Sequence, residues 1–169
     1  VNFGIMYGAG PYRMSQELGI TMKEARKLID HYFNTYPGIR RYMDKTLENA
    51  RNNGYVETLF KRKRKTGNLS ASNKNLVQAE QRAAINMPIQ GTAADLIKIA
   101  MINIHKRMNS ENYKSKMILQ IHDELLFECP EDKVHKFGEM VQYEMETAVS
   151  LVVPLKVDWN YGKNWYEAH

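Results

Sequence analysis

The sequence lacks the cysteine pairs and the long apolar segments that are typical of secreted and membrane-bound proteins. It contains a single cysteine, Cys129, so no disulfide can form within the chain. No apolar run approaches the ~18 residues of a membrane-spanning helix. Internal repeats and low-complexity linkers are also absent from the sequence. These absences exclude a disulfide-stapled domain, an integral membrane protein and a repeat array, and they favour a soluble protein of a reducing compartment with no membrane partner.

Positively charged residues only slightly outnumber negatively charged ones. Lys and Arg total 24 against 19 Asp and Glu, which gives a net charge of +5 and a pI near 9.2. This composition is a modest bias towards anionic partners such as nucleic acids. The chain begins with Val1 rather than Met, directly in the apolar stretch "NFGIMYG", so we expect it to be a piece of a longer chain.

Helix and strand signals follow one another irregularly along the chain. Gly19 and Gly54 mark helix ends, and Thr21 opens a capping box. Pro88 should interrupt a long helical run. We expect helices at 10–19, 21–36, 39–53, 75–87, 91–109 and 131–151, a strand at 55–60, an exposed basic loop at 61–75, a hairpin at 117–129 and a strand at 154–161. This order predicts an α+β fold with helices packed on a small antiparallel sheet.

The stretch "ILQIHDELLFE", residues 118–128, places three titratable side chains at the turn of the expected hairpin. His122, Asp123 and Glu124 interrupt a run that is otherwise apolar. Asp and Glu often do no more than solvate a tight turn. Adjacent acids on a hairpin can also hold a divalent cation, because Mg²⁺ is bound by one or two carboxylates together with substrate phosphates. A cation would also relieve the repulsion between the two carboxylates.

A second group of polar side chains lies in "QRAAINMPIQGTAAD". Arg82, Asn86 and Gln90 are spaced by four residues, so on a helix they would share one face. Their guanidinium and amide groups suit hydrogen bonds to the minor-groove acceptors that every base pair presents. An exposed polar helix face, without any ligand, would have the same pattern.

A third group lies in "NFGIMYG", where Phe3 and Tyr7 would share one face of a helix. Gly4 and Gly8 leave room for close approach to the backbone, and exposed aromatic rings suit stacking against a base. Ordinary helix core is the alternative interpretation of such an aromatic pair.

Taken together, these stretches resemble the family A DNA polymerases, of which bacterial DNA polymerase I is the type. "VNFGIMYG" is similar to the second half of motif B on the fingers helix, and "QIHDELLFE" to motif C in the palm. "GYVETLF", "INMPIQGTAADLIKIAM" and "VPLKVDWNYGKNWYEA" match the pattern of the family between and after these motifs. The resemblance covers essentially the whole chain.

The resemblance implies a role for each acidic and aromatic site. Asp123 is similar to the metal ligand of motif C, Glu124 to its neighbouring acid, and His122 to a group near the primer terminus. Phe3 resembles the aromatic side chain that packs against the incoming sugar. Tyr7 resembles the ring that occupies the template stacking position.

Two further groups would contact DNA. The resemblance implies minor-groove contacts to template and primer from Arg82, Asn86 and Gln90. The run "KRKRK" is either a solvated loop or a phosphate contact. Because it follows a fingers-side strand in the family order, we expect weak contact with the DNA backbone from Lys61, Arg62 and Arg64.

The implied reaction is attack of a primer 3′ oxygen on the α-phosphate of a dNTP at a two-metal Mg²⁺ site, in DNA replication and repair. The implied partners are primer-template DNA, dNTPs and the upstream part of the same polymerase, and the implied location is the bacterial cytoplasm at the nucleoid. About 1–75 would belong to the fingers, and about 76–169 to the fingers-to-palm helices and the palm with its hairpin at 117–129.

The sequence also departs from the family pattern. Motif A, whose aspartate supplies the other bridging metal ligand, is absent from these residues, as are the cations that open the fingers helix. We therefore expect the 169-residue chain alone to be inactive and capable of self-association. Two alternatives stay open, namely a non-catalytic basic module that binds duplex DNA and a metal-dependent nuclease.

Overall fold

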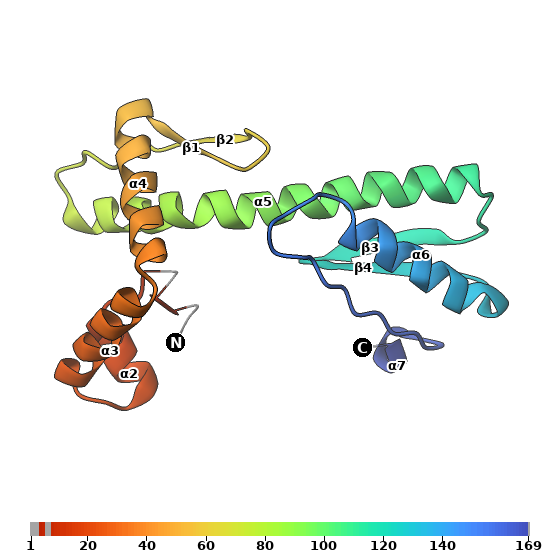
Figure 1. Ribbon diagram of the computed structural model, residues 1–169, viewed down its shortest axis with the longest axis horizontal. Helices are drawn as coiled ribbons and strands as arrows, with labels where there is room; N and C mark the ends of the chain where they lie inside the picture. Colours follow the sequence, from red (N-terminus) through yellow and green to blue (C-terminus); the bar gives the residue numbers. More distant parts are fainter. Residues whose placement is uncertain (1–3, 6–7, 169) are drawn as a thin grey trace. The chain divides into compact units, whose positions relative to one another are not determined.

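The computed structural model describes residues 4–5 and 8–168. Its helices and strands are α2 (Pro11–Leu18), α3 (Met22–Thr35), α4 (Pro37–Asn53), β1 (Tyr55–Glu57), β2 (Lys63–Lys65), α5 (Lys74–Ser110), β3 (Lys116–Ile121), β4 (Glu124–Glu128), the 3-10 helix η1 (Glu131–Lys133), α6 (Val134–Glu146) and α7 (Trp165–Ala168). They form two compact units, Val1–Thr92 and Ala93–His169, and α5 contributes to both (Figure 1). The mixture of helices with antiparallel strand pairs confirms the expected α+β fold.

The helices of the first unit begin and end where the sequence signals predict. α2 ends at Gly19 and α4 at Gly54, and both glycines adopt left-handed backbone conformations with φ of 64° and 74°. Thr21 and Glu24 form the reciprocal hydrogen bonds of a capping box at the start of α3. These three predicted boundaries are confirmed.

Two apolar clusters hold the first unit together. One joins α2 to α3 through Met14 and Ala25. The other packs Ala50 of α4 and Val56 of β1 against Ala84 of α5, where Figure 1 shows α4 crossing α5 beside the β1–β2 hairpin. Burial of a side chain such as Met14 or Val56 stabilises the fold by about 1.5–3 kcal/mol.

The prediction of an exposed loop throughout residues 61–75 is wrong, because β2 lies within it. The expected strand at 55–60 is also shorter, with β1 covering only its first half, and β1 pairs antiparallel with β2. Lys63 lies over the ring of Tyr55 at 4.2 Å, and Arg64 forms an ion pair with Glu80 at 2.6 Å. The basic run forms a strand because β1 and α5 supply partners for its alternating side chains.

The predicted interruption at Pro88 is also wrong, because α5 is one helix from Lys74 to Ser110. Proline has no N–H, so the carbonyl of Ala84 loses its helical donor. The next carbonyl, that of Ile85, accepts a hydrogen bond from the Tyr42 hydroxyl at 2.9 Å. α4 therefore provides an external donor at the point where the proline weakens the helix.

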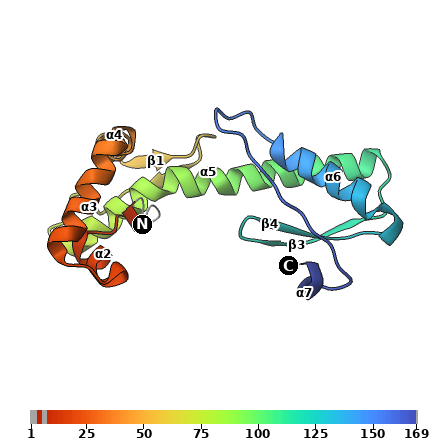
Figure 2. The same ribbon diagram turned by 60° about the horizontal axis from the view of Figure 1, so that its bottom comes forward.

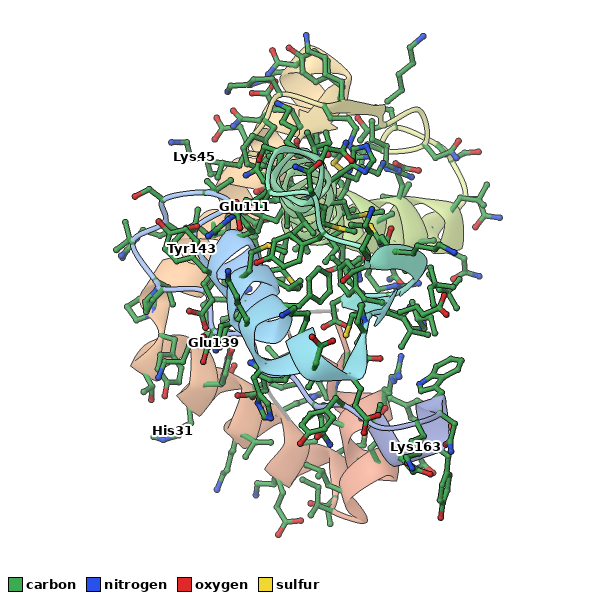
Figure 3. All side chains as sticks on the ribbon, turned by 90° about the vertical axis from the view of Figure 1, so that its right-hand side faces the viewer. His31, Lys45, Glu111, Glu139, Tyr143 and Lys163 are labelled. Atoms are coloured by element: carbon green, nitrogen blue, oxygen red, sulfur yellow. The ribbon has the colours of Figure 1, made fainter. Side chains whose placement is uncertain are left out.

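The second unit is built around the expected hairpin at 117–129, which is confirmed as β3 and β4. One face of this hairpin packs on the last turns of α5 and on α6 (Figure 2), around Ile104 and Phe137. Phe127 of β4 meets Phe137 edge-on, with ring centroids 5.3 Å apart. The register shifts between Met117 and Leu119, which indicates a β-bulge in β3.

Two predictions for the C-terminal third are wrong. The helix expected at 131–151 begins as η1 and ends at Glu146, and residues 154–161 form no strand. Val157 bonds to side chains of α6 instead, donating its N–H to Glu146 at 3.0 Å and accepting from Gln142 at 2.7 Å. A strand needs a partner strand, and within the described residues this segment has side chains of a helix as partners. The short α7 was not predicted.

Candidate functional site

The three titratable residues predicted at the hairpin turn, His122, Asp123 and Glu124, lie at the tip of the β3–β4 hairpin. Ile121 pairs with Glu124, so His122 and Asp123 form the two-residue connection and Glu124 opens β4. His122 has a φ of 51°, a left-handed conformation that a residue other than glycine adopts at a cost of about 1–3 kcal/mol. The side-chain amide of Gln120 donates to the carbonyl of His122 at 3.1 Å, which helps to hold this backbone.

All three side chains at the tip are exposed, whereas the strands beneath them are anchored. Leu125 and Phe127 of β4 and Met117 of β3 pack on the apolar cluster of α5 and α6. A partly buried base with a strained, exposed tip is typical of sites where strain is retained for function. The hairpin therefore presents His122, Asp123 and Glu124 to a ligand from a rigid support.

The donor set of this tip fits part of a magnesium site. Asp123 and Glu124 offer exposed carboxylate oxygens, the ligands that Mg²⁺ prefers. Among residues 4–5 and 8–168, no cluster of three or more His, Cys, Asp or Glu side chains could hold a metal ion. The described residues can therefore contribute two carboxylates, and a complete two-metal site needs further ligands.

The polar side chains predicted to contact the minor groove, Arg82, Asn86 and Gln90, follow one another along α5. Asn86 and Gln90 line a shallow hollow of about 350 Å³ with Arg64, Ala83, Met87 and Gly91. Arg82 lies one turn before them and is exposed. The hollow joins amide donors and acceptors of α5 to a cation of β2.

Arg82 also lies against the N-terminal glycine motif. A Cβ at Gly8 would lie 2.8 Å from Cγ of Arg82, so the glycine leaves space for the aliphatic part of this side chain. Gly8 of the N-terminal stretch therefore packs against Arg82 of α5. Phe3 and Tyr7 themselves lie outside the described residues.

The three cations predicted to contact DNA have partners within the first unit. Lys61 pairs with Glu57 at 2.6 Å, and this hydrogen bond raises the pKa of Lys61. Arg62 donates from Nη2 to the carbonyl of Gly91 at 2.8 Å. Arg64 binds Glu80, whose side chain is only 9% exposed. The side chain of Lys61 is 76% exposed, so solvent screens its ion pair with Glu57 and the pair adds little to stability.

Comparison with known proteins decides the family. A family model described as DNA polymerase family A matches residues 1–167. The chain belongs to DNA polymerase family A. DNA polymerase I of Lactococcus lactis is 46% identical over 168 residues, which are 99% of this chain and 19% of that protein. DNA polymerase I of Streptococcus pneumoniae is 47% identical over 168 residues, again 99% of this chain and 19% of the relative.

A solved structure is similar to the family A chain over the same range. The POL domain of Pol1 from M. smegmatis, in complex with DNA primer-template and dNTP, has a TM-score of 0.94 and 39% sequence identity, covering 99% of this chain and 30% of that one. The chain spans about a fifth of the length of the curated relatives it matches. None of the helices in the described part is both long and apolar enough to cross a membrane.

Sequence reasoning named candidate site residues of the family A chain but missed the residues that support them. Tyr42, Glu80 and Thr92 hydrogen-bond or pair with the backbone and side chains around Asn86 and Gln90. Tyr42 and Glu80 have partners distant in sequence, and Thr92, although it donates to Pro88 in the same helix, also accepts from the distant Leu59. Only the Glu80–Arg64 pair has a sequence signal, which is an acid in a helix facing a basic run.

Proposed function

We propose that the chain is the C-terminal part of the polymerase domain of a template-directed DNA polymerase. The reaction is transfer of a nucleotide from a dNTP to a primer 3′-OH during DNA replication and repair. About 1–75 belongs to the fingers and about 76–169 to the fingers-to-palm helices and the palm. Membership in family A supports the activity, and the partners named for the M. smegmatis structure, primer-template DNA and dNTP, support the substrates.

The observation that carries the proposal is the strained tip of the β3–β4 hairpin. Asp123 and Glu124 would hold Mg²⁺ at the primer end, and His122 would contact the primer terminus. When bound, the metal ion supplies charge stabilisation to the attacking and leaving oxygens. The hairpin fixes these side chains before substrate arrives, and such preorganisation is the main contribution that a protein makes to this kind of chemistry.

The α5 side chains would hold the duplex next to this tip. Arg82, Asn86 and Gln90 carry donors that match the acceptors shared by all base pairs in the minor groove. They would therefore bind primer and template without selecting a sequence. Phe3 and Tyr7 are assigned to the incoming sugar and the template base, and Lys61 and Arg64 to the DNA backbone, all from the family resemblance.

The upstream part of the same polymerase is the partner expected for the second unit. Ile118 and Leu119 of β3 are 57% and 45% exposed, although they lie in a strand beside the candidate metal ligands. Apolar side chains of this kind favour burial against further protein. In the isolated chain they would favour self-association instead. In the cell we place the protein in the bacterial cytoplasm at the nucleoid, where the DNA substrate is.

The two alternatives are less well supported. A metal-dependent nuclease needs further acids beside Asp123 and Glu124, and the described residues offer no third one. A basic module that binds duplex DNA without catalysis gives no role to the exposed carboxylates of Asp123 and Glu124 beside the left-handed backbone of His122.

The test is an Asp123→Ala variant of the full-length polymerase. We expect primer extension to fall by about a hundredfold to a thousandfold, because stabilisation of transition-state charge is lost, while primer-template binding stays near that of the parent. Glu128→Ala is the matched control, since Glu128 is also an exposed acid of β4 but lies at the other end of the hairpin, opposite Lys116. Parent-like extension by the Asp123→Ala variant would refute the assignment.

A further inference from the structure

The carbonyl groups around Pro88 receive hydrogen bonds from outside the backbone of α5. In residues 85–92, the Pro88 segment, the Ile85 carbonyl accepts from Tyr42 at 2.9 Å and the Gly91 carbonyl accepts from Arg62 at 2.8 Å. The donors come from α4 and from the β1–β2 connection. They lie one on each side of the proline, whose missing N–H leaves the carbonyl of Ala84 without its helical donor.

Thr92 adds a second link between α5 and the β1–β2 connection. Its hydroxyl donates to the carbonyl of Pro88 and accepts from the N–H of Leu59 at 3.0 Å. Gly91 allows the close approach, because a Cβ at this position would lie 2.6 Å from Cγ2 of Thr58. The connection that follows β1 therefore lies directly on the Pro88 segment.

Asn86 and Gln90 lie within the Pro88 segment. Gln90 directly precedes Gly91, the residue whose carbonyl Arg62 holds. A hydrogen bond from a guanidinium is charge-assisted and directional, and the planar group presents its donors in a fixed geometry. Displacement of a substrate-contacting group by about 1 Å can lower a rate a hundredfold. The orientation of Gln90 consequently depends on what fixes the peptide beside it.

We propose that Arg62 is a positioning residue, which holds the Gly91 carbonyl and thereby orients Gln90 and Asn86 towards the primer-template duplex. This inference rests on the proposed function and gives Arg62 a role other than contact with a DNA phosphate. Thr92 acts in the same way through Pro88 and Leu59. Arg62 thus contributes to DNA binding through the helix that it supports.

The first test uses the full-length polymerase with Arg62→Ala, Arg62→Lys and Thr92→Val, and Lys65→Ala as the control that removes a cation from the same exposed run. We expect kcat/KM for primer extension to fall about tenfold in the first three variants and to stay unchanged in the control. Arg62→Lys should fail to rescue, since it keeps the charge but loses the planar group. Thr92→Ser should retain the parent rate because it keeps the hydroxyl.

Salt dependence separates positioning from phosphate contact. With Arg62→Ala, the slope of log Kd against log salt for primer-template binding should equal that of the parent, whereas loss of a phosphate contact would lower it by about one. Combining Arg62→Ala with Gln90→Ala should give less than the sum of the two losses, because Arg62 acts through Gln90. A lowered slope, additive losses or rescue by lysine would each overturn the inference.

A second test needs no activity. In the 169-residue chain, Arg62→Ala should speed amide hydrogen exchange at residues 89–92, and Lys65→Ala should not. If the full-length parent fails to extend primers, the proposed function fails while this exchange measurement still decides the positioning role. Unchanged exchange in Arg62→Ala, beside an active parent, would refute the positioning role alone.

Discussion

Substitution of Gly91 by alanine tests how closely the β1–β2 connection packs on α5. The added Cβ would lie 2.6 Å from Cγ2 of Thr58, well inside the contact distance of two carbons. Thr58 is only 2% exposed and β-branched, so its methyl group has no free space into which to turn. One of the two backbones must therefore move.

Two opposing effects set the size of the change. Overpacking of a buried contact costs about 1–3 kcal/mol. Alanine in place of glycine within a helix increases the free energy of unfolding by about 0.5–1 kcal/mol. The net loss of stability is then about 1 kcal/mol, which for a unit of this size lowers the melting temperature by about 4–8 °C. Moving the connection also removes the hydrogen bonds to Gly91 and Thr92, so primer extension by the full-length variant should decrease as well.

The measurement is thermal unfolding of the 169-residue chain followed by two signals. Both tryptophans, Trp159 and Trp165, belong to the second unit, so their fluorescence reports that unit, whereas far-UV circular dichroism also reports the helices of the first. We expect Gly91→Ala to lower the midpoint temperature seen by circular dichroism and to leave the midpoint seen by tryptophan fluorescence unchanged. Gly38→Ala, the control on α4, has its nearest neighbouring atom at 3.9 Å and should stabilise by about 0.5 kcal/mol. A Gly91→Ala chain as stable as the parent would refute the close approach.

Three further predictions concern the rest of the chain. Gly138→Ala should destabilise the second unit and shift tryptophan emission to the red, because its Cβ would lie 2.7 Å from the Trp159 ring. Burial raises the pKa of Tyr42, so the unfolded chain loses this proton first as the pH rises; stability should fall above about pH 10, and less so in Tyr42→Phe when denaturation midpoints are compared. The 169-residue chain with Mg²⁺, primer-template and all four dNTPs should extend no primer beyond an Asp123→Ala control, and extension above that control would mean that it holds a complete metal site.

Local signals predicted the parts of the fold that depend on a few neighbouring residues. Gly19, Gly54 and the Thr21 capping box each fix a helix end through contacts within four residues, and the sequence identified all three. The two-residue turn at His122 is likewise set by the strands on either side of it. Such features are visible in the sequence because their physical cause is short-ranged.

The predictions that were wrong concern features that depend on residues distant in sequence. β2 depends on Glu80, which is 16 residues from its partner Arg64, and continuity at Pro88 is accompanied by a bond from Tyr42, which is 43 residues from Ile85. Neither contact leaves a periodic pattern in the sequence. The candidate site divides in the same way, since its carboxylates could be predicted but the residues that hold Asn86 and Gln90 could not.

Pro88 connects these observations to the function. A polymerase must bind duplexes of any sequence, so its duplex contacts have to be donors that suit every base pair, held in a fixed geometry. Side chains on a helix provide that geometry, but a proline inside the helix removes one donor and weakens the helix around it. Arg62, Tyr42 and Thr92 supply hydrogen bonds to the carbonyls of this segment from three different parts of the first unit. The segment that carries Asn86 and Gln90 is therefore fixed by tertiary contacts, and, on the proposed function, substitutions of Arg62, Tyr42 or Thr92 should alter how the full-length protein holds a primer-template.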